Sequence, residues 1–114
     1  MSVIKLSCLQ LELLESDNEI KIFQSIEEIF KLSIKPDLII LSELATQGVL
    51  PRKDKSLTHY LPIYSEIAKK YDTWLIPGTF HEFEDDVIYN SCPVINNKGE
   101  LVAKARKLYP WLPY

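Results

Sequence analysis

A continuous apolar run behind an amphipathic helix limits the possible folds of this sequence more than any other feature. Residues 38–41 are Leu-Ile-Ile-Leu, a pattern typical of a strand covered on both faces. Ahead of them, residues 16–18 supply a helix cap, apolar side chains recur at steps of three and four over residues 22–30, and Pro36 prevents that helix from continuing. With the β-rich residues 1–11, these segments predict a βαβ unit with parallel strands and a right-handed crossover.

A second helix and a third strand are predicted further along the chain. Residues 56–71 carry apolar side chains at helical spacing, although Pro62 removes a backbone hydrogen bond in the first half and favours a kink. Before this helix, residues 46–55 hold glycine, proline and four charged residues, which indicates a surface loop. Residues 73–80 are β-rich, and Pro77-Gly78 marks a strand end where the backbone turns or another group approaches closely.

The last two β-rich runs predict an antiparallel hairpin. Residues 87–95 and 100–107 flank an Asn-Asn-Lys-Gly turn, in which Gly99 supplies the left-handed conformation. This order of elements predicts an α/β fold in which two helices cover one face of a mixed sheet. The opposite face is then exposed, paired with a partner chain, or completed by sequence beyond these 114 residues.

Charge and cysteine content argue against several classes of function. A formal net charge of −3 and a pI near 5.4 give no basic surface for nucleic acid or an anionic membrane. Residues 1–14 resemble neither a signal peptide nor a membrane span, so a cytoplasmic location is predicted.

Cys8 and Cys92 lie in apolar runs and are expected to be inert core thiols, with a disulfide or a metal pair as the alternative. No zinc site is expected, because the zinc-like pattern at His81 lacks a second histidine and residues 82–86 fit a solvated acidic turn.

Glu43 is the first candidate for chemistry. It follows the apolar strand at its carboxyl end, the place where ligands collect in open α/β sheets. A carboxylate at this place can equally well cap a helix or remain a solvated loop charge. Its position alone therefore leaves the role of Glu43 open.

Lys107 is the second candidate. Alternation along the last strand places Lys107 on the same face as the apolar Leu101, Ala103 and Ala105, whereas Lys104 and Arg106 are expected in solvent on the other face. A lysine on an inward face is costly unless a carboxylate pairs with it or it stabilises an oxyanion. The alternative is that the strand ends at Arg106 and Lys107 turns out into solvent.

Segments along nearly the whole chain carry a family resemblance in their order and spacing. In residues 38–46 an apolar strand ends in glutamate, with Ser42 where the family usually has proline. The remaining segments are residues 68–71, 74–78, 89–91, 96–100 and 105–107, the last with Ala105 at the tyrosine of a Tyr-Arg-Lys motif. Together they resemble the N-terminal portion of the nitrilase superfamily of carbon-nitrogen hydrolases.

This resemblance implies an αββα sandwich that is incomplete here, with residues 1–114 forming a partial domain truncated after the lysine strand. It also implies a Glu-Lys-Cys triad that hydrolyses amides, nitriles or carbamoyl compounds through a thioester, without metal or cofactor. Glu43 would be the general base, with its pKa raised toward neutrality, and Lys107 would stabilise the oxyanion. Neither Cys8 nor Cys92 matches the family's nucleophile, so the chain alone is expected to be inactive.

The expected partners follow from the same resemblance. A small-molecule amide or nitrile is the expected substrate, and a second copy of the chain or a complementary chain is the expected protein partner. The alternative function is a non-catalytic or vestigial fragment that acts as an interaction module through its uncovered sheet face.

Overall fold

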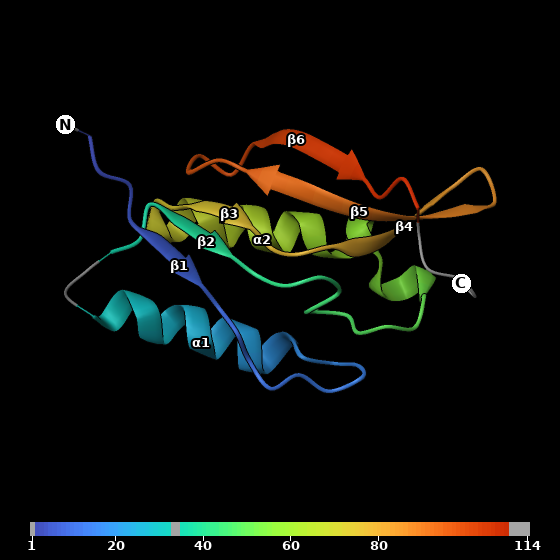
Figure 1. The fold of residues 1–114 in the computed structure, drawn as a ribbon, viewed down its shortest axis with the longest axis horizontal. Coiled ribbons are helices and arrows are strands. Elements are labelled where there is room, and N and C mark those ends of the chain that lie inside the picture. The colour runs from blue at the N-terminus through green and yellow to red at the C-terminus, as the bar shows by residue number, and fades with distance from the viewer. Residues whose placement is uncertain (1, 33–34, 110–114) are drawn as a thin grey trace.

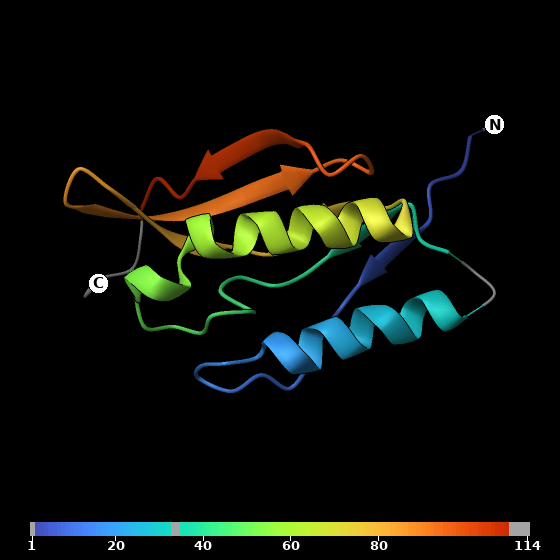
Figure 2. The same cartoon turned by 180° about the vertical axis from the view of Figure 1, so that it is seen from behind.

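Both helices lie on the same side of a mixed β-sheet, as Figure 1 and the reverse view in Figure 2 show. The computed structural model describes residues 2–32 and 35–109. Within these residues the elements are β1 (Leu6–Cys8), α1 (Glu19–Lys31), β2 (Leu38–Ile40), the short 3₁₀ helix η1 (Lys53–Lys55), α2 (Leu57–Tyr71), β3 (Trp74–Ile76), β4 (Phe80–Glu84), β5 (Val87–Ile95) and β6 (Leu101–Arg106). The predicted fold class, a mixed sheet with two helices, is confirmed.

The sheet joins a parallel βαβ half to an antiparallel half. β1, β2 and β3 run parallel, and β5 continues the sheet antiparallel to β3 through the pair Leu75–Ile95. β5 also pairs with both β4 and β6, so the predicted hairpin of β5 and β6 is present. The prediction of an acidic turn over residues 82–86 was wrong in its extent, because β4 runs to Glu84 and the turn consists of Asp85 and Asp86.

The hydrophobic core lies between the helices and the sheet. Ile22 and Ile26 of α1 are buried as the helical spacing predicts, and α2 runs through Pro62 without a break. Aromatic side chains of α2 pack against Phe80, with ring centroids 5.4 Å from Tyr60 and 5.9 Å from Tyr64. The other buried apolar residues are Ile39, Leu41, Ala45, Leu57, Ala68, Leu75 and Ile95.

Two predicted boundaries were wrong. β1 spans Leu6–Cys8 rather than residues 1–11, because its partner β2 offers only Leu38–Ile40 for pairing. Residues 46–48 are buried rather than part of a surface loop, because Thr46 and Gln47 are hydrogen-bonded to side chains of α2 and β4. Their burial fixes the position of the segment that carries Glu43.

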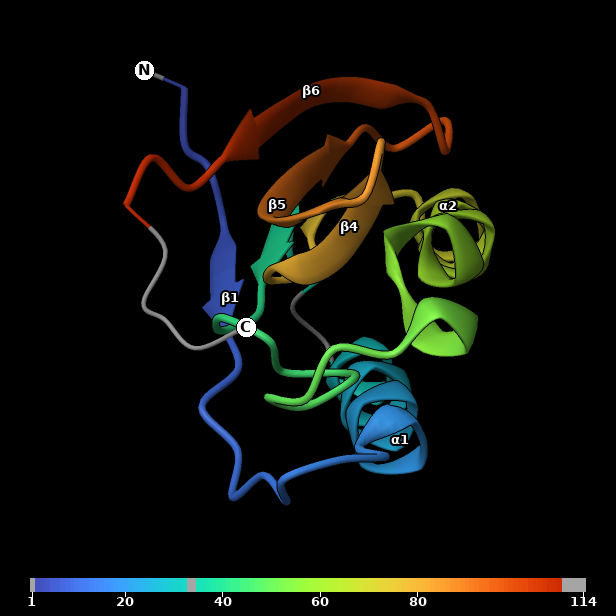
Figure 3. The ribbon, with the colours of Figure 1, turned by 90° about the vertical axis from the view of Figure 1, so that its right-hand side faces the viewer.

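Within the described residues no helix lies on the sheet face opposite α1 and α2, as Figure 3 shows. Apolar side chains remain exposed on it, including Leu6 at 58% and Trp74 at 41%. Cys8 lies on this face and is exposed, so the expectation of a buried core thiol was wrong for this residue. Burial of Cys8 would need a layer on that face.

Neither helix of the described chain is long and apolar enough to cross a membrane.

Candidate active site

A carboxylate and an ammonium group from distant parts of the chain meet at one end of the sheet. Glu43 follows β2 and Lys107 follows β6, and Lys107 Nζ donates to Glu43 Oε1 at 2.7 Å. Although β6 ends at Arg106, the backbone N–H of Lys107 still donates to the carbonyl oxygen of Asn90 at 2.8 Å. This bond continues the alternation of β6, so Lys107 points toward Glu43 rather than away from the sheet.

Asn90 contacts both of these residues, and sequence reasoning assigned it no role. Its side-chain amide donates to Glu43 Oε1 at 2.8 Å, while its carbonyl oxygen accepts from Lys107. The side chain is on the same face of β5 as Cys92, by alternation, and the residue is only 2% exposed. An inward-facing polar residue in a strand was the signal that could have identified it.

The turn that carries Glu43 is held in an unusual conformation. Leu44 has φ +52, a left-handed value that non-glycine residues rarely adopt, and its N–H donates to Thr79 Oγ1 at 3.0 Å. Gly78 lies against the same turn, because a Cβ atom there would stand 2.0 Å from the carbonyl oxygen of Ser42. The close approach predicted at Pro77-Gly78 is therefore present, and it is an approach to the turn beside Glu43.

Buried hydrogen bonds anchor the segment that follows this turn. The Asn18 amide donates to the carbonyl oxygen of Ala45 at 3.0 Å instead of capping α1. The Thr46 hydroxyl is hydrogen-bonded to the hydroxyl of Tyr64, and Gln47 Nε2 donates to Nδ1 of the buried His81. Contacts from α1, α2 and β4 thus hold the Glu43 segment in place.

The charge state of Glu43 differs from the expectation. The hydrogen bond from Lys107 holds the pKa of Glu43 below its ordinary value, and this outweighs the opposing effect of partial burial. The expected rise toward neutrality was wrong for this structure, because the Glu43 side chain is 51% exposed and directly paired with a cation. Glu43 is therefore an ionised carboxylate at neutral pH.

A hollow of about 350 Å³ opens beside the pair. Cys92 lines it, half-buried, and burial raises the pKa of its thiol, so the thiol stays protonated at neutral pH. Cys92 is thus close to the candidate groups, which its position in the sequence did not suggest. The other lining residues are Glu43, Thr79, Asn90, Ala105, Arg106 and Lys107.

Lys104 is exposed and Arg106 is partly exposed, in line with the expectation that both face solvent, but neither side chain is unpaired. Both pair with Glu82 of β4, and Arg106 Nε lies 2.9 Å from Glu82 Oε1. Ser91 Oγ donates to the same oxygen at 2.7 Å. Burial favours a higher pKa for Glu82, but these hydrogen bonds outweigh it and lower the pKa to about 2. This network uses the side chains on the opposite face of β6 from Lys107.

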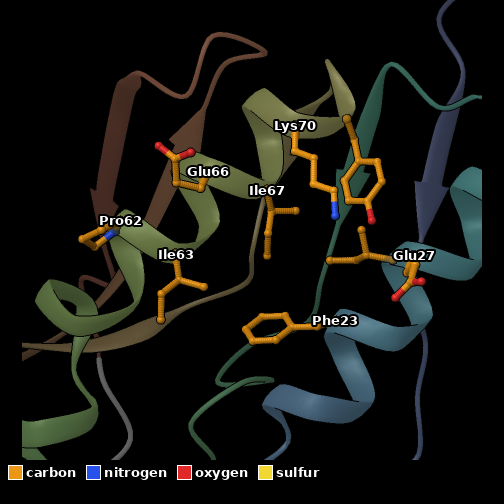
Figure 4. A pocket seen from close by; sticks show the side chains of 9 residues that line it. Phe23, Glu27, Pro62, Ile63, Glu66, Ile67 and Lys70 are labelled. Carbon is orange, nitrogen blue, oxygen red and sulfur yellow. The ribbon is translucent and has the colours of Figure 1, made fainter.

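A larger hollow, of about 610 Å³, lies between α1 and α2 and is drawn in Figure 4. Its walls are mainly apolar, with Phe23 from α1 and Ile63 and Ile67 from α2 pointing into it. The charged side chains that line it are Glu27, Glu66 and Lys70. Because it contains neither Glu43 nor Lys107, the smaller hollow is the candidate active site.

Comparison with known structures defines the class to which this fold belongs. The structure superposes on that of Saccharomyces cerevisiae Nit3, a member of branch 10 of the nitrilase superfamily, with a TM-score of 0.78 and 25% identity, covering 93% of this chain and 44% of that one. It also matches an N-terminal amidase with a bound Gln-Gly peptide, with a TM-score of 0.72 and 25% identity, covering 95% of this chain and 28% of that one. The chain therefore has the fold of the matching part of these nitrilase-like structures.

Sequence matches identify the family. The model of the carbon-nitrogen hydrolase family matches residues 6–114, and the chain belongs to that family. A formamidase from Nitratidesulfovibrio vulgaris (strain DP4) is 34% identical over 89 residues, which is 68% of this chain and 26% of that protein. The omega-amidase NIT2 of Pongo abelii is 34% identical over 87 residues, or 60% of this chain and 32% of that protein. The chain spans about a quarter to a third of these relatives, and the predicted resemblance to the N-terminal portion of the nitrilase superfamily is confirmed.

Proposed function

We propose that this chain supplies two of the three catalytic groups of a carbon-nitrogen hydrolase that acts on small amides. The observation that carries the proposal is the contact between Lys107 Nζ and Glu43 Oε1, 2.7 Å long and beside a hollow, in a member of this family. Glu43 is the general base and Lys107 stabilises the oxyanion. The cysteine nucleophile comes from residues outside these 114, as the greater length of the relatives suggests.

The proposed reaction begins when Glu43 takes the proton of the cysteine thiol. The sulfur attacks the amide carbon, and negative charge develops on the carbonyl oxygen. This oxygen accepts a hydrogen bond from Lys107. The amine takes a proton from Glu43 as it leaves, and a thioester remains. Glu43 then removes a proton from water, which cleaves the thioester to a carboxylic acid and restores the thiol.

The contact between Glu43 and Lys107 has a use in this sequence of steps. While Lys107 is bound to Glu43, the lowered pKa keeps the carboxylate ionised and ready to accept a proton. As Lys107 turns toward the developing oxyanion, Glu43 loses the donor that lowers its pKa and becomes a stronger base. The ammonium group of Lys107 thus contacts the carboxylate of Glu43 before the attack and stabilises the oxyanion after it.

The proposal predicts that the purified chain by itself does not hydrolyse amides. Cys92 lines the hollow, but its protonated thiol lies within a strand and is a poor nucleophile. Ammonia release from formamide and from a Gln-Gly peptide would be measured for the chain and for a Cys92→Ser variant. We expect no release above the buffer blank. Turnover that disappears in Cys92→Ser would make Cys92 the nucleophile and contradict the proposal that a cysteine outside this chain attacks.

A second candidate function, an interaction module, is favoured by the uncovered sheet face. We expect the chain to self-associate through this face, because Leu6 and Trp74 are exposed there. Sedimentation velocity over a range of concentrations would measure it. Trp74→Ser should reduce the association, whereas Leu50→Ser, at an exposed residue of the loop before η1, should leave it unchanged. A wild-type chain that stays monomeric at all concentrations would argue against this function.

A further inference from the structure

Resting on the proposed function, we infer that Asn90 is a positioning residue that holds Glu43 by Oε1, so that Oε2 is the oxygen that accepts the proton. Asn90 Nδ2 and Lys107 Nζ donate to the same oxygen, at 2.8 Å and 2.7 Å. Within residues 2–32 and 35–109, no hydrogen bond to Oε2 of Glu43 is present. The carboxylate is therefore bound on one oxygen and open on the other.

Asn90 is suited to this role because it cannot move easily. It is 2% exposed, it lies in the nine-residue strand β5, and it pairs with His81 of β4 on one side. Its carbonyl oxygen accepts the N–H of Lys107 on the other side. A single residue of β5 thus fixes the distance between the backbone that carries the lysine and the carboxylate of the glutamate.

Lys107 alone would not fix the carboxylate in the same way. Its side chain is 40% exposed, and a lysine ammonium group on a flexible stem can follow Glu43 through several rotamers. In the proposed reaction Lys107 also leaves Glu43 for the oxyanion. The bond from Asn90 is the one that persists through that step, and it holds Oε1 so that Oε2 remains the oxygen that accepts the proton.

The test is a titration of the glutamate carboxyl groups by carbon NMR in the full 114-residue chain. The Glu43 resonance is assigned by its loss in Glu43→Gln. Asn90→Ala removes the donor and should raise the pKa of Glu43 by about half a unit to one unit. Asn90→Asp keeps the shape but places a second carboxylate there, so it should raise this pKa further. The three-bond coupling constants of the Glu43 side chain should change from the values of a single rotamer to values averaged over several rotamers.

Ser91→Ala is the matched control, because Ser91 is the next residue of β5 and donates to Glu82 on the other face of the strand. It should raise the pKa of Glu82 and leave that of Glu43 unchanged. The Asn90 variants should instead raise the pKa of Glu43 and leave that of Glu82 unchanged. An unchanged pKa and unchanged couplings of Glu43 in both Asn90 variants would overturn the inference. Equal shifts of Glu43 and Glu82 in Asn90→Ala would also overturn it, because they would indicate general loosening of the sheet.

If circular dichroism shows that both Asn90 variants are unfolded, Asn90 serves the stability of the sheet and the positioning role is refuted. The titration needs no turnover, so its outcome is independent of the proposed hydrolysis. A shifted pKa of Glu43 in the chain, together with no hydrolysis by a complete enzyme that contains this chain, would uphold the contact and refute the proposed function. An unchanged pKa of Glu43, together with hydrolysis by that complete enzyme, would refute the positioning role and uphold the function.

Discussion

Glu43→Gln is expected to abolish most of the hydrolytic activity of a complete enzyme that contains this chain. The enzyme would be a chimaera in which this chain replaces the matching segment of the Nitratidesulfovibrio vulgaris formamidase, to which it is 34% identical over 89 residues. Glutamine keeps the size of the side chain and can still contact Lys107, but it cannot accept a proton from the nucleophile. The kcat for formamide should fall by about 10²–10⁴-fold, as expected for the loss of a general base.

Two further variants make this result specific. Glu66→Gln removes an exposed carboxylate that pairs with Lys69 on α2, and it should leave kcat unchanged. Lys107→Met should lower kcat by about 10²–10³-fold, the usual cost of losing one donor to an oxyanion. A Glu43→Gln chimaera that retains the activity of its parent would contradict the role of Glu43 as the base, whatever the effect of Lys107→Met.

Gly78→Ala is expected to cause a large loss of stability in this chain. Gly78 has φ +83, and an added Cβ atom would stand 2.0 Å from the backbone oxygen of Ser42, where no flexible side chain can move aside. Left-handed strain and overpacking together should lower the free energy of unfolding by about 3 kcal/mol. Urea unfolding followed by circular dichroism measures this loss. Because Ser42 precedes Glu43, the contact between Glu43 and Lys107 should also weaken.

Gly99→Ala separates the two causes. Gly99 has a similar φ of +81, but the nearest neighbour of an added Cβ atom is the backbone oxygen of Ser65 at 2.7 Å, a milder clash in a half-buried turn. Its loss should be about 1–2 kcal/mol, mainly from left-handed strain. Equal losses in the two variants would show that the close approach of Gly78 to Ser42 adds nothing to the effect of its backbone conformation.

Much of the fold could be predicted because the local signals agreed with one another. The helical spacing of Ile22 and Ile26, the continuous apolar residues of β2 and the glycine turn at Gly99 all lead to the observed elements. β4 could not be predicted with the same success, because Glu82 and Glu84 look like solvent-facing charges until their partners on β6 are known. Pairing between strands is a property of the folded chain that single residues do not reveal.

The candidate site was predictable in part for the same reason. Strand ends and alternation pointed to Glu43 and Lys107, and the structure brings these two side chains into contact. Asn90 could have been noticed as an inward-facing polar residue of a strand, but its contact with Glu43 could not be derived, since that contact depends on how β5 lies relative to both β2 and β6. The charge state of Glu43 was also out of reach, because it depends on whether the partner cation is in contact with the carboxylate or only near it.

The pairing of β5 with β6 has a consequence for how homologous sequences can differ in length. Lys107 faces Glu43 only while β6 keeps its register with β5. Between Val94 and Ile95 the pairing shifts, and from there to the end of β6 the register is regular. An insertion of one residue between that shift and Lys107 would turn the lysine to the Glu82 side of the sheet. The Asp85–Asp86 tip has no such restriction, so length variation should collect there and be excluded from the strand that leads to the lysine.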